Sequence, residues 1–314
     1  MQLYILNQKY LDIAAAESKA SAFGWGWWEH KELPIDGTLL LNTRKRPAHL
    51  GLVRRVIKVL ASCAQGNVRT TLADLQWERI IGKRSFKVVL TNLTPARIPE
   101  REFASVIWHR LQSPRVNLDK PEIVIQIVLT TTVAHVGIVL WENTEDFESR
   151  RAHLRPEIHP SSMHPALARA IVNLSCSPSV HDPFCGSGGL LIEAGLAHKR
   201  ASGADINVAM IARTRANCRA YHLHPTLRVA DATHWVPRSG AVIADLPYGR
   251  NTAPVALGTL LDAFLIRATQ STRRAVLGLP HEMTVSQFGS WRVRAHLTVY
   301  IHKSMTKHLY VLER

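Results

Sequence analysis

The C-terminal half of the chain alternates short apolar runs with amphipathic segments. The apolar runs end at residues 181, 204, 229 and 244, and a fifth ends near Gly278. Helical spacing of apolar residues covers the intervening segments 189–199, 207–221 and 256–271. This alternation predicts parallel strands joined by helices that cover both faces of one sheet. The last two strand-like runs, 291–300 and 309–312, are too close for a crossover helix, so they predict an antiparallel hairpin at the sheet edge.

The N-terminal half has a different pattern, which predicts a separate α+β region. Strand-like runs cover 86–90, 122–128 and 136–140, helical spacing covers 101–111, and a further helix is expected over 54–64. Shorter strand-like runs lie at 4–6 and 38–41. The expected organisation is a small α+β unit over residues 1–49, an α+β domain over 50–141, a charged linker over 142–156 and an α/β domain over 157–314.

The composition indicates a globular protein with a polyanionic partner. The chain has 314 residues, of which 46% are hydrophobic, so it can bury sizeable cores. Its net charge is +15 and its pI is about 10.1. Residues 1–155 carry 22 Lys and Arg against 15 Asp and Glu, and residues 156–314 carry 17 against 9. A positive excess in both halves favours a long nucleic acid, although a protein can also be basic without such a partner.

Other features of the sequence bear on its compartment and on metals. Cys63, Cys176, Cys185 and Cys218 include no Cys-x-x-Cys pair, so we expect no zinc site and four free thiols, as in a reducing cytoplasm. Residues 1–22 carry charges within their apolar stretch, unlike a signal peptide. No run of about eighteen apolar residues occurs, so no membrane span is expected. The 16 histidines form no metal-binding pattern, and we expect a monomer without metal.

A glycine-rich turn follows the first C-terminal strand. The segment Asp182-Pro-Phe-Cys-Gly-Ser-Gly-Gly189 places glycines between a strand and a helix, where the backbone can approach a ligand. Its Gly-x-Gly-Gly spacing differs from the Gly-x-Gly-x-x-Gly of dinucleotide-binding turns. Asp205 and Asp231 end the next two strands, and strand ends of an open α/β sheet line one crevice. Asp205 can accept hydrogen bonds from ribose hydroxyls there and Asp231 from an adenine amino group, while each alone could instead cap a helix.

A fourth aspartate opens the segment Asp245-Leu-Pro-Tyr-Gly249. An exocyclic amino group on a purine is a poor nucleophile because its lone pair is delocalised into the ring. Asp245 and the carbonyl of residue 246 or 247 can accept both of its N–H bonds and so favour a pyramidal nitrogen with an available lone pair. Pro247 restricts the local backbone. Tyr248 offers a ring on which an extruded base can stack, worth about 1–3 kcal/mol.

With these motifs, the C-terminal half resembles a class I methyltransferase of the amino-methylating kind, with the Asp/Asn-x-Pro-Tyr/Phe motif intact. The segment 151–174 narrows the resemblance to THUMP-containing tRNA guanosine N2-methyltransferases, in particular the archaeal guanosine-10 enzymes. The likeness covers about residues 50–314. It implies an α/β fold: a Rossmann-like class I domain with a seven-stranded, mostly parallel sheet, preceded by an α+β THUMP-like RNA-binding region. It also implies S-adenosylmethionine as the cofactor and tRNA as the partner.

The resemblance assigns roles to two sets of residues. In that family the segment before the glycine turn packs beside the cofactor, so Met163, His164 and Pro165 would border the pocket. The remaining expected cofactor-binding residues are Asp182, Cys185, Gly186, Ser187, Gly188, Gly189, Asp205, Ile206, Asp231, Ala232 and Asp245. The expected catalytic residues are Asp245, Pro247 and Tyr248.

Residues 50–141 resemble a THUMP domain in the order of their elements, and that family's domain grips the single-stranded acceptor end of tRNA. Basic residues expected to contact phosphates are Lys83, Arg84, Lys87, Arg97 and Arg101, although a basic residue taken alone is more often a solvated surface charge. The aromatic run 25–28 admits base stacking or packing against a neighbouring domain. Packing is favoured because large aromatic side chains are mostly buried.

The motifs predict methyl transfer from S-adenosylmethionine to an exocyclic amino group, and the resemblance implies that this is the N2 amino group of a guanosine in tRNA, at position 10. Three alternatives stay open: another tRNA or ribosomal RNA guanosine, an adenine N6 in DNA, and a non-catalytic RNA-binding assembly factor. No DNA target-recognition insert is evident between Asp182 and Arg314. The number of methyl groups added and the need for a small activating subunit also stay open.

Overall fold

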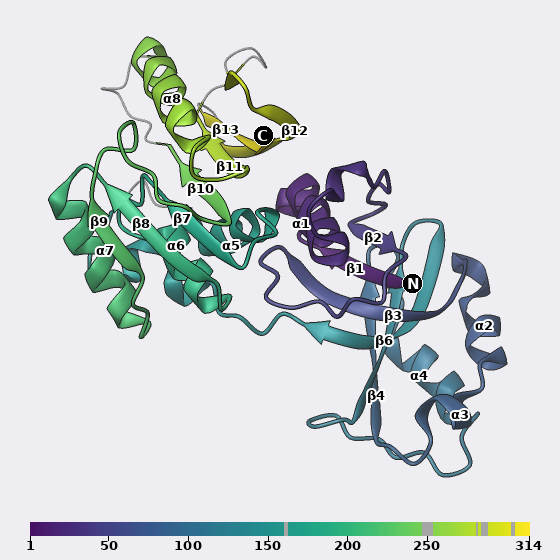
Figure 1. The fold of residues 1–314 in the computed structure, drawn as a ribbon. Coiled ribbons are helices and arrows are strands. Elements are labelled where there is room, and N and C mark those ends of the chain that lie inside the picture. The colour runs from purple at the N-terminus through teal and green to yellow at the C-terminus, as the bar shows by residue number, and fades with distance from the viewer. Residues whose placement is uncertain (160–162, 247–253, 281, 284–287, 303–304) are drawn as a thin grey trace. The chain divides into compact units, whose positions relative to one another are not determined.

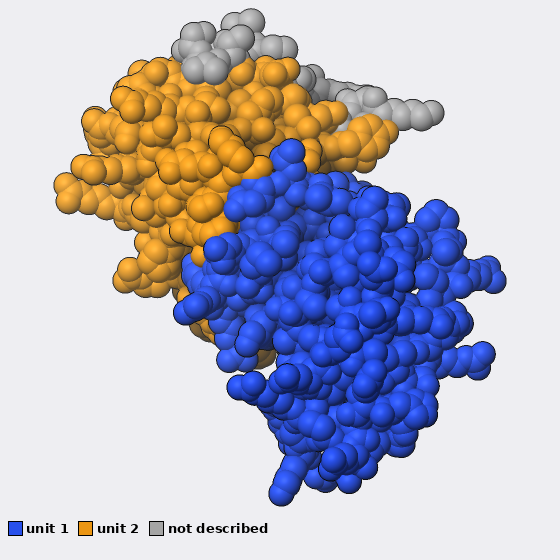
Figure 2. Space-filling model, turned by 90° about the vertical axis from the view of Figure 1, so that its right-hand side faces the viewer, with its two compact units in different colours: residues 1–11, 32–48, 53–143 blue, residues 12–31, 49–52, 144–314 orange. Residues whose placement is uncertain are grey.

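The computed structural model describes residues 1–159, 163–246, 254–280, 282–283, 288–302 and 305–314 (Figure 1). The chain divides into two compact units, coloured separately in Figure 2. Unit 1 comprises residues 1–11, 32–48 and 53–143, and unit 2 comprises residues 12–31, 49–52 and 144–314. Among the described residues, no helix combines the length and apolarity that a bilayer span requires.

Unit 1 is built on a mixed sheet of six strands. Its strands are β1 (Gln2–Leu6), β2 (Thr38–Leu41), β3 (Val53–Ala64), β4 (Phe86–Asn92), β5 (Ile123–Leu129) and β6 (Val133–Glu142), and its helices are α2 (Val68–Asp74), α3 (Trp77–Ile81) and α4 (Glu100–Trp108). The spatial order is β2-β1-β3-β6-β5-β4, with β4 and β5 parallel and the other neighbours antiparallel. Trp77, Phe86 and Phe103 are buried in one core that joins α3, β4 and α4.

The helix expected over 54–64 is wrong, because these residues form strand β3 in the middle of the sheet. β3 pairs with β1 on one side and β6 on the other. Its pairing with β6 shifts register between Val56 and Ile57 and again between Val59 and Ala61. Each irregularity breaks the alternation of inward and outward side chains, so that the adjacent residues Val56 and Ile57 are both buried. The resulting spacing of apolar residues imitates the period of a helix.

The N-terminal residues also divide differently from the expected separate unit over 1–49. β1 pairs with both β2 and β3, so residues 1–11 and 32–48 share the sheet of residues 53–143. Residues 12–31, which hold all but the first residue of α1 (Leu11–Phe23), belong to unit 2. The local pattern of a sequence predicts whether a segment is a strand, but not which distant strand it pairs with. The pairing of β1 with β3 decides which residues belong to unit 1.

Unit 2 contains the expected seven-stranded, mostly parallel sheet. Its strands are β7 (Ser179–Asp182), β8 (Arg200–Asp205), β9 (Thr226–Val229), β10 (Ala241–Asp245), β11 (Arg274–Leu279), β12 (Arg292–His302) and β13 (Met305–Glu313). Its helices besides α1 are α5 (Pro165–Leu174), α6 (Gly189–Leu196), α7 (Val208–Ala220) and α8 (Pro254–Ala268). The order is β12-β13-β11-β10-β7-β8-β9. The hairpin prediction is confirmed, since β13 is antiparallel to both β11 and β12.

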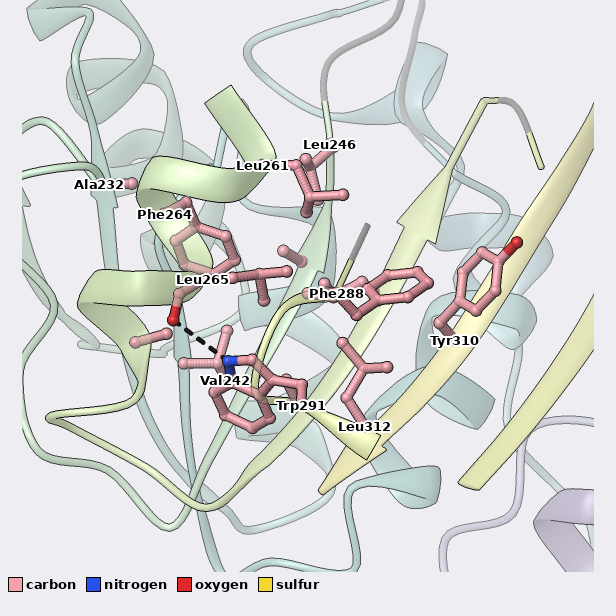
Figure 3. Close-up of a cluster of buried hydrophobic side chains, with 14 of the residues drawn as sticks. Ala232, Val242, Leu246, Leu261, Phe264, Leu265, Phe288, Trp291, Tyr310 and Leu312 are labelled. Carbon is pink, nitrogen blue, oxygen red and sulfur yellow. Dashed lines mark hydrogen bonds between the residues drawn. The ribbon is translucent and has the colours of Figure 1, made fainter. Parts of the chain in front are cut away.

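A buried cluster packs α8 against strands β10, β11 and β13 of this sheet (Figure 3). Val242, Phe264 and Leu312 are fully buried in it. Trp291 packs into the same cluster, and its Nε1 donates a hydrogen bond to the carbonyl of Leu265 over 3.1 Å. β10 pairs with β11 on one side and β7 on the other. With the packing of the cluster, this pairing fixes the position of Asp245 at the end of β10.

A buried ion network ties the segment before α5 to helices α5 and α6. Glu193 of α6 is fully buried, and it pairs with Arg150 over 2.9 Å and with Arg169 over 2.9 Å. Both guanidinium groups lie over the ring of Phe147, at 4.7 and 5.6 Å from its centroid. Buried charges require such partners because desolvation is costly. The network therefore fixes α6, whose first residue is the last glycine of the turn.

The aromatic run packs within unit 2. Trp27 is buried, and the Nε1 of Trp25 donates a hydrogen bond to Glu313 over 2.5 Å. The guanidinium of Arg274 lies over the Trp25 ring, 4.6 Å from its centroid. These contacts hold the segment after α1 on strands β11 and β13 of the same unit, so Trp25 packs within unit 2 and not against a neighbouring domain.

Candidate functional site

Four aspartates lie side by side at the carboxyl ends of the parallel strands. Asp245, Asp182 and Asp205 are the last residues of β10, β7 and β8, and Asp231 follows β9 by two residues. Their order along the edge is that of the strands, β10-β7-β8-β9. All four line one cavity of about 470 Å³. The crevice expected at the strand ends of an open α/β sheet is therefore present.

The turn after β7 is held by the next carboxylate along the edge. Oδ2 of Asp205 accepts the backbone N–H of Gly186 over 3.0 Å, and Oδ1 accepts that of Asn207 over 2.9 Å. Gly186 and Gly188 have φ angles of 53° and 89°, a region that glycine enters without steric cost. A Cβ at Gly186 would meet nothing closer than 4.0 Å, so its cost would lie in the backbone conformation. Each Asp205 oxygen keeps a lone pair for a ligand hydroxyl.

Asp231 is fixed in a similar way. Its Oδ1 accepts the backbone N–H of Thr233 over 2.8 Å and the Thr233 hydroxyl over 2.7 Å. These hydrogen bonds hold the pKa of the Asp231 carboxyl below its usual value. Asp231 is therefore an anionic acceptor at neutral pH, and Oδ2 has further capacity beside His234.

Asp182 differs from these two because it is almost fully buried. Its Oδ1 accepts the backbone N–H of Phe184 over 3.0 Å. Burial raises the pKa of the Asp182 carboxyl well above its usual value, and the nearby carboxylates of Asp245 and Asp205 add to the rise. Asp182 therefore binds a proton more readily than an exposed aspartate does, and a positively charged ligand would favour its ionised form.

Asp245 forms an ion pair that the sequence analysis missed. Nζ of Lys307 on β13 donates to both Asp245 oxygens over 2.6 Å each, and the Lys307 side chain is only 1% exposed. Burial raises the pKa of the Asp245 carboxyl, and the Lys307 ammonium opposes that rise. The Asp245 side chain keeps 17% exposure and lines the cavity. No local motif marks Lys307, which is 62 residues from its partner.

Most of the expected cofactor-binding residues line the cavity. Besides the four aspartates these are Met163, Cys185, Gly186, Ser187, Gly189, Ile206 and Ala232. His164, Pro165 and Gly188 are not among its lining residues. The His164 ring instead accepts the backbone N–H of Ala166 at the start of α5 and contacts Glu148. Pro247 and Tyr248 lie outside the described residues. Lining residues that the sequence analysis did not assign to the cofactor include His159, Phe184, Asn207, Met210, Thr233 and Leu260.

The charge of the cavity wall is one-sided. Four carboxyl groups line it, and the described lining residues include neither Lys nor Arg. Such a wall favours a ligand with positive charge and hydrogen-bond donors, and it disfavours a pyrophosphate. Phe184, Met210 and Leu260 supply apolar surface beside these acceptors. The cavity therefore fits a cationic ligand with hydroxyl groups and an apolar or aromatic part.

The five basic residues expected to contact phosphates lie in two groups in unit 1. Lys83 and Arg84 precede β4 and are exposed, and Lys87 is the half-buried second residue of β4. Arg97 and Arg101 are exposed beyond the other end of that strand. A strand of seven residues spans roughly 20 Å, so the two groups mark separate places along the unit. Phe86, between Arg84 and Lys87, is buried in the core and is not a stacking surface.

Comparison with known proteins agrees with this geometry. A family profile described as an RMKL-like methyltransferase domain matches residues 152–306. The tRNA (guanine(10)-N2)-dimethyltransferase of Methanothermobacter thermautotrophicus is 26% identical, over 99% of each chain. The protein of the same name from Pyrococcus abyssi is 30% identical, over 76% of this chain and 77% of its own.

Solved structures show the same fold. TrmN from Thermus thermophilus is 18% identical with a TM-score of 0.52, and the likeness covers 100% of this chain and 99% of that one. A possible methylase from Clostridium difficile 630 is 14% identical with a TM-score of 0.53, over 99% of this chain and 97% of that one. With the strand order of unit 2, this likeness confirms the class I methyltransferase fold.

Proposed function

The chain belongs to the family of the tRNA (guanine(10)-N2)-dimethyltransferases, and we propose that it transfers methyl groups from S-adenosylmethionine to the exocyclic N2 amino group of a guanosine in tRNA. The target position is 10, the position in the names of these relatives, and their names also indicate two methyl groups. The observation that carries the proposal is the row of four aspartates along one cavity.

The cavity has the features that S-adenosylmethionine requires. This cofactor supplies a methyl group on a positively charged sulfur, which is already activated for transfer without a metal. The carboxylate-rich wall matches the positive charges of its sulfonium and amino groups. Asp205 would accept from the ribose hydroxyls, and Asp231 would accept from the adenine amino group. The open space at Gly186 allows the backbone to approach the amino-acid part.

Asp245 would act on the target base. Its carboxylate faces Lys307 on one side and the cavity on the other, so a lone pair remains for an N–H of the guanine amino group. Acceptance of that hydrogen bond localises the nitrogen lone pair on N2, where it can attack the methyl carbon. The N–C bond forms as the C–S bond breaks, and N2 then releases a proton to Asp245 or to water. We propose that Pro247 directs a second acceptor and that Tyr248 stacks the base.

Unit 1 would supply affinity for the RNA. Its mixed sheet and three helices form a separate compact unit with exposed basic residues at both ends of β4. We propose that this unit is THUMP-like and that Lys83, Arg84, Lys87, Arg97 and Arg101 contact phosphates. Such contacts give binding that weakens steeply with salt and carries little sequence information.

Asp245→Asn tests the proposed division of roles. This change keeps the shape of the side chain but removes its charge and one acceptor, so turnover of unmodified tRNA should fall about a hundredfold or more. Binding of S-adenosylmethionine, measured by calorimetry, should stay within about threefold, since Asp205 and Asp231 remain. Asp262→Asn, on an exposed position of α8, is the matched control and should leave both quantities unchanged. Equal loss of binding and turnover in the Asp245 variant would contradict the assignment.

A further inference from the structure

The path of the Lys307 side chain to Asp245 crosses a strand that lies between them. Asp245 is on β10 and Lys307 is on β13, and β11 separates the two strands. Gly278 of β11 is paired in register with Asp245 on one side and with Leu309 on the other. A Cβ at Gly278 would come within 2.9 Å of the Asp245 Oδ1 and 3.5 Å of the Lys307 Cδ. The absent side chain at Gly278 therefore leaves the space in which the ion pair forms.

The pair has a large electrostatic effect because Lys307 is removed from water and Asp245 is mostly buried, with only its cavity side accessible. Lys307 is 1% exposed, and a buried ammonium is stable only with close partners. Asp245 shares its cavity with Asp182 and Asp205, and burial raises the pKa of the Asp245 carboxyl, so its ionised form depends on the opposing ammonium of Lys307. The charged and titratable groups around Asp245 among the described residues are thus Lys307 from β13, Asp182 from β7 and Asp205 from β8. Lys307 is the positive charge of this set.

Lys307 also limits the directions in which Asp245 can act. One lone pair on each carboxylate oxygen is directed to Nζ, and the lone pairs that remain face the accessible side. A pair with two 2.6 Å contacts restricts rotation of the carboxylate plane. The carboxylate is thereby oriented before any substrate binds, which removes a reorganisation cost from the reaction.

We propose that Lys307 is a positioning residue of the methyl transfer, which holds Asp245 ionised and oriented so that it accepts a hydrogen bond from the target amino group. The inference rests on the proposed function of Asp245. The ion pair makes Asp245 a weaker base, but removal of the proton from N2 after methylation does not require a strong base. Once N2 has gained the methyl group it bears a positive charge, and loss of its proton restores conjugation with the ring. A weak base or water is then sufficient, whereas a protonated Asp245 could not accept the hydrogen bond that exposes the lone pair.

The test compares Lys307→Met, which removes the charge from a buried position, with Lys307→Arg, which keeps it. For Lys307→Met, kcat near neutral pH should fall at least about tenfold, and the acid limb of its pH profile should move to higher pH. In Lys307→Arg, which keeps the positive charge, the acid limb of the pH profile should return to its wild-type position, whatever the value of kcat. Lys199→Met is the matched control, since Lys199 bonds the carbonyl of Ser177 before β7 and should leave the profile unchanged.

A second measurement does not depend on turnover. The side-chain carboxyl carbon of Asp245 can be followed by ¹³C NMR in the protein without ligand and assigned from its absence in Asp245→Asn. Its titration should move to higher pH in Lys307→Met and return toward wild type in Lys307→Arg. An unmoved titration and an unmoved acid limb, with wild-type protein active, would overturn the role of Lys307 alone. A wild-type protein that titrates as expected but never methylates guanosine would overturn the proposed function, and with it the role of Lys307 in catalysis.

Discussion

Removal of the charge at Glu193 should strongly destabilise unit 2. The Glu193 side chain is fully buried between the guanidinium groups of Arg150 and Arg169, both within 2.9 Å. Glu193→Gln would leave Arg169, which is also fully buried, with the Glu145 carboxylate at 3.8 Å as its remaining ion-pair contact. Loss of one partner from a buried pair costs about 3–5 kcal/mol. We expect about 3 kcal/mol, because Glu145 still pairs with Arg150 at 3.0 Å.

Urea unfolding followed by tryptophan fluorescence and circular dichroism measures this loss. With a denaturant slope of about 1–3 kcal/mol/M, a loss of about 3 kcal/mol lowers the midpoint by at least about 1 M. Glu145→Gln is the control within the same network, and its side chain is 30% exposed, so its cost should be about 1 kcal/mol or less. A loss below about 1 kcal/mol in Glu193→Gln, or equal losses in the two variants, would refute the reasoning.

Three further predictions concern single residues. Asp205→Asn removes a charged acceptor from the cavity wall, so calorimetry should show S-adenosylmethionine affinity reduced by about 10-fold or more; unchanged affinity would remove Asp205 from the site. Burial lowers the pKa of His181 to about 4, so its unfolded form gains a proton first as pH falls below about 6.5. The burial of neutral His181 should therefore add about 3 kcal/mol to the free energy of unfolding above that pH, and this should be lost as the pH falls toward 4. In His181→Asn, which can keep the hydrogen bond to Ser202, the free energy of unfolding should change less over this pH range. Trp25→Phe loses the hydrogen bond to Glu313, so the free energy of unfolding should fall by about 1–2 kcal/mol. The tRNA affinity, measured by filter binding, should stay the same. Weaker tRNA binding with unchanged stability would show that Trp25 contacts RNA and does not serve packing.

The sequence predicted those parts of the site that depend on local order. Asp182, Asp205 and Asp245 end buried strands, and in a parallel sheet the carboxyl ends of strands share one edge. A short apolar run followed by an acidic residue is therefore enough to predict that the acidic side chain lies at the carboxyl edge of the sheet. The glycine turn is predictable for the same reason, since positive φ angles at Gly186 and Gly188 are a local backbone property.

Features that depend on distant pairing were not predictable from local patterns. Lys307 reaches Asp245 across β11 beside Gly278, where a Cβ would come within 2.9 Å of the Asp245 Oδ1, and neither Lys307 nor Gly278 stands out in the sequence. Irregular pairing in β3 gave a strand the apolar spacing of a helix. Residues 1–11 share unit 1 with residues 53–143 because β1 pairs with β3, about 50 residues further along, and no local pattern indicates that pairing.

The most direct test of the account is methylation of unmodified tRNA transcripts with labelled S-adenosylmethionine, followed by nucleoside analysis. The account predicts label in N2-methylguanosine or N2,N2-dimethylguanosine, which disappears when the guanosine at position 10 is replaced. Label in another guanosine would retain the chemistry and change the target. Absence of label in any tRNA guanosine, from protein that binds S-adenosylmethionine, would contradict the central claim.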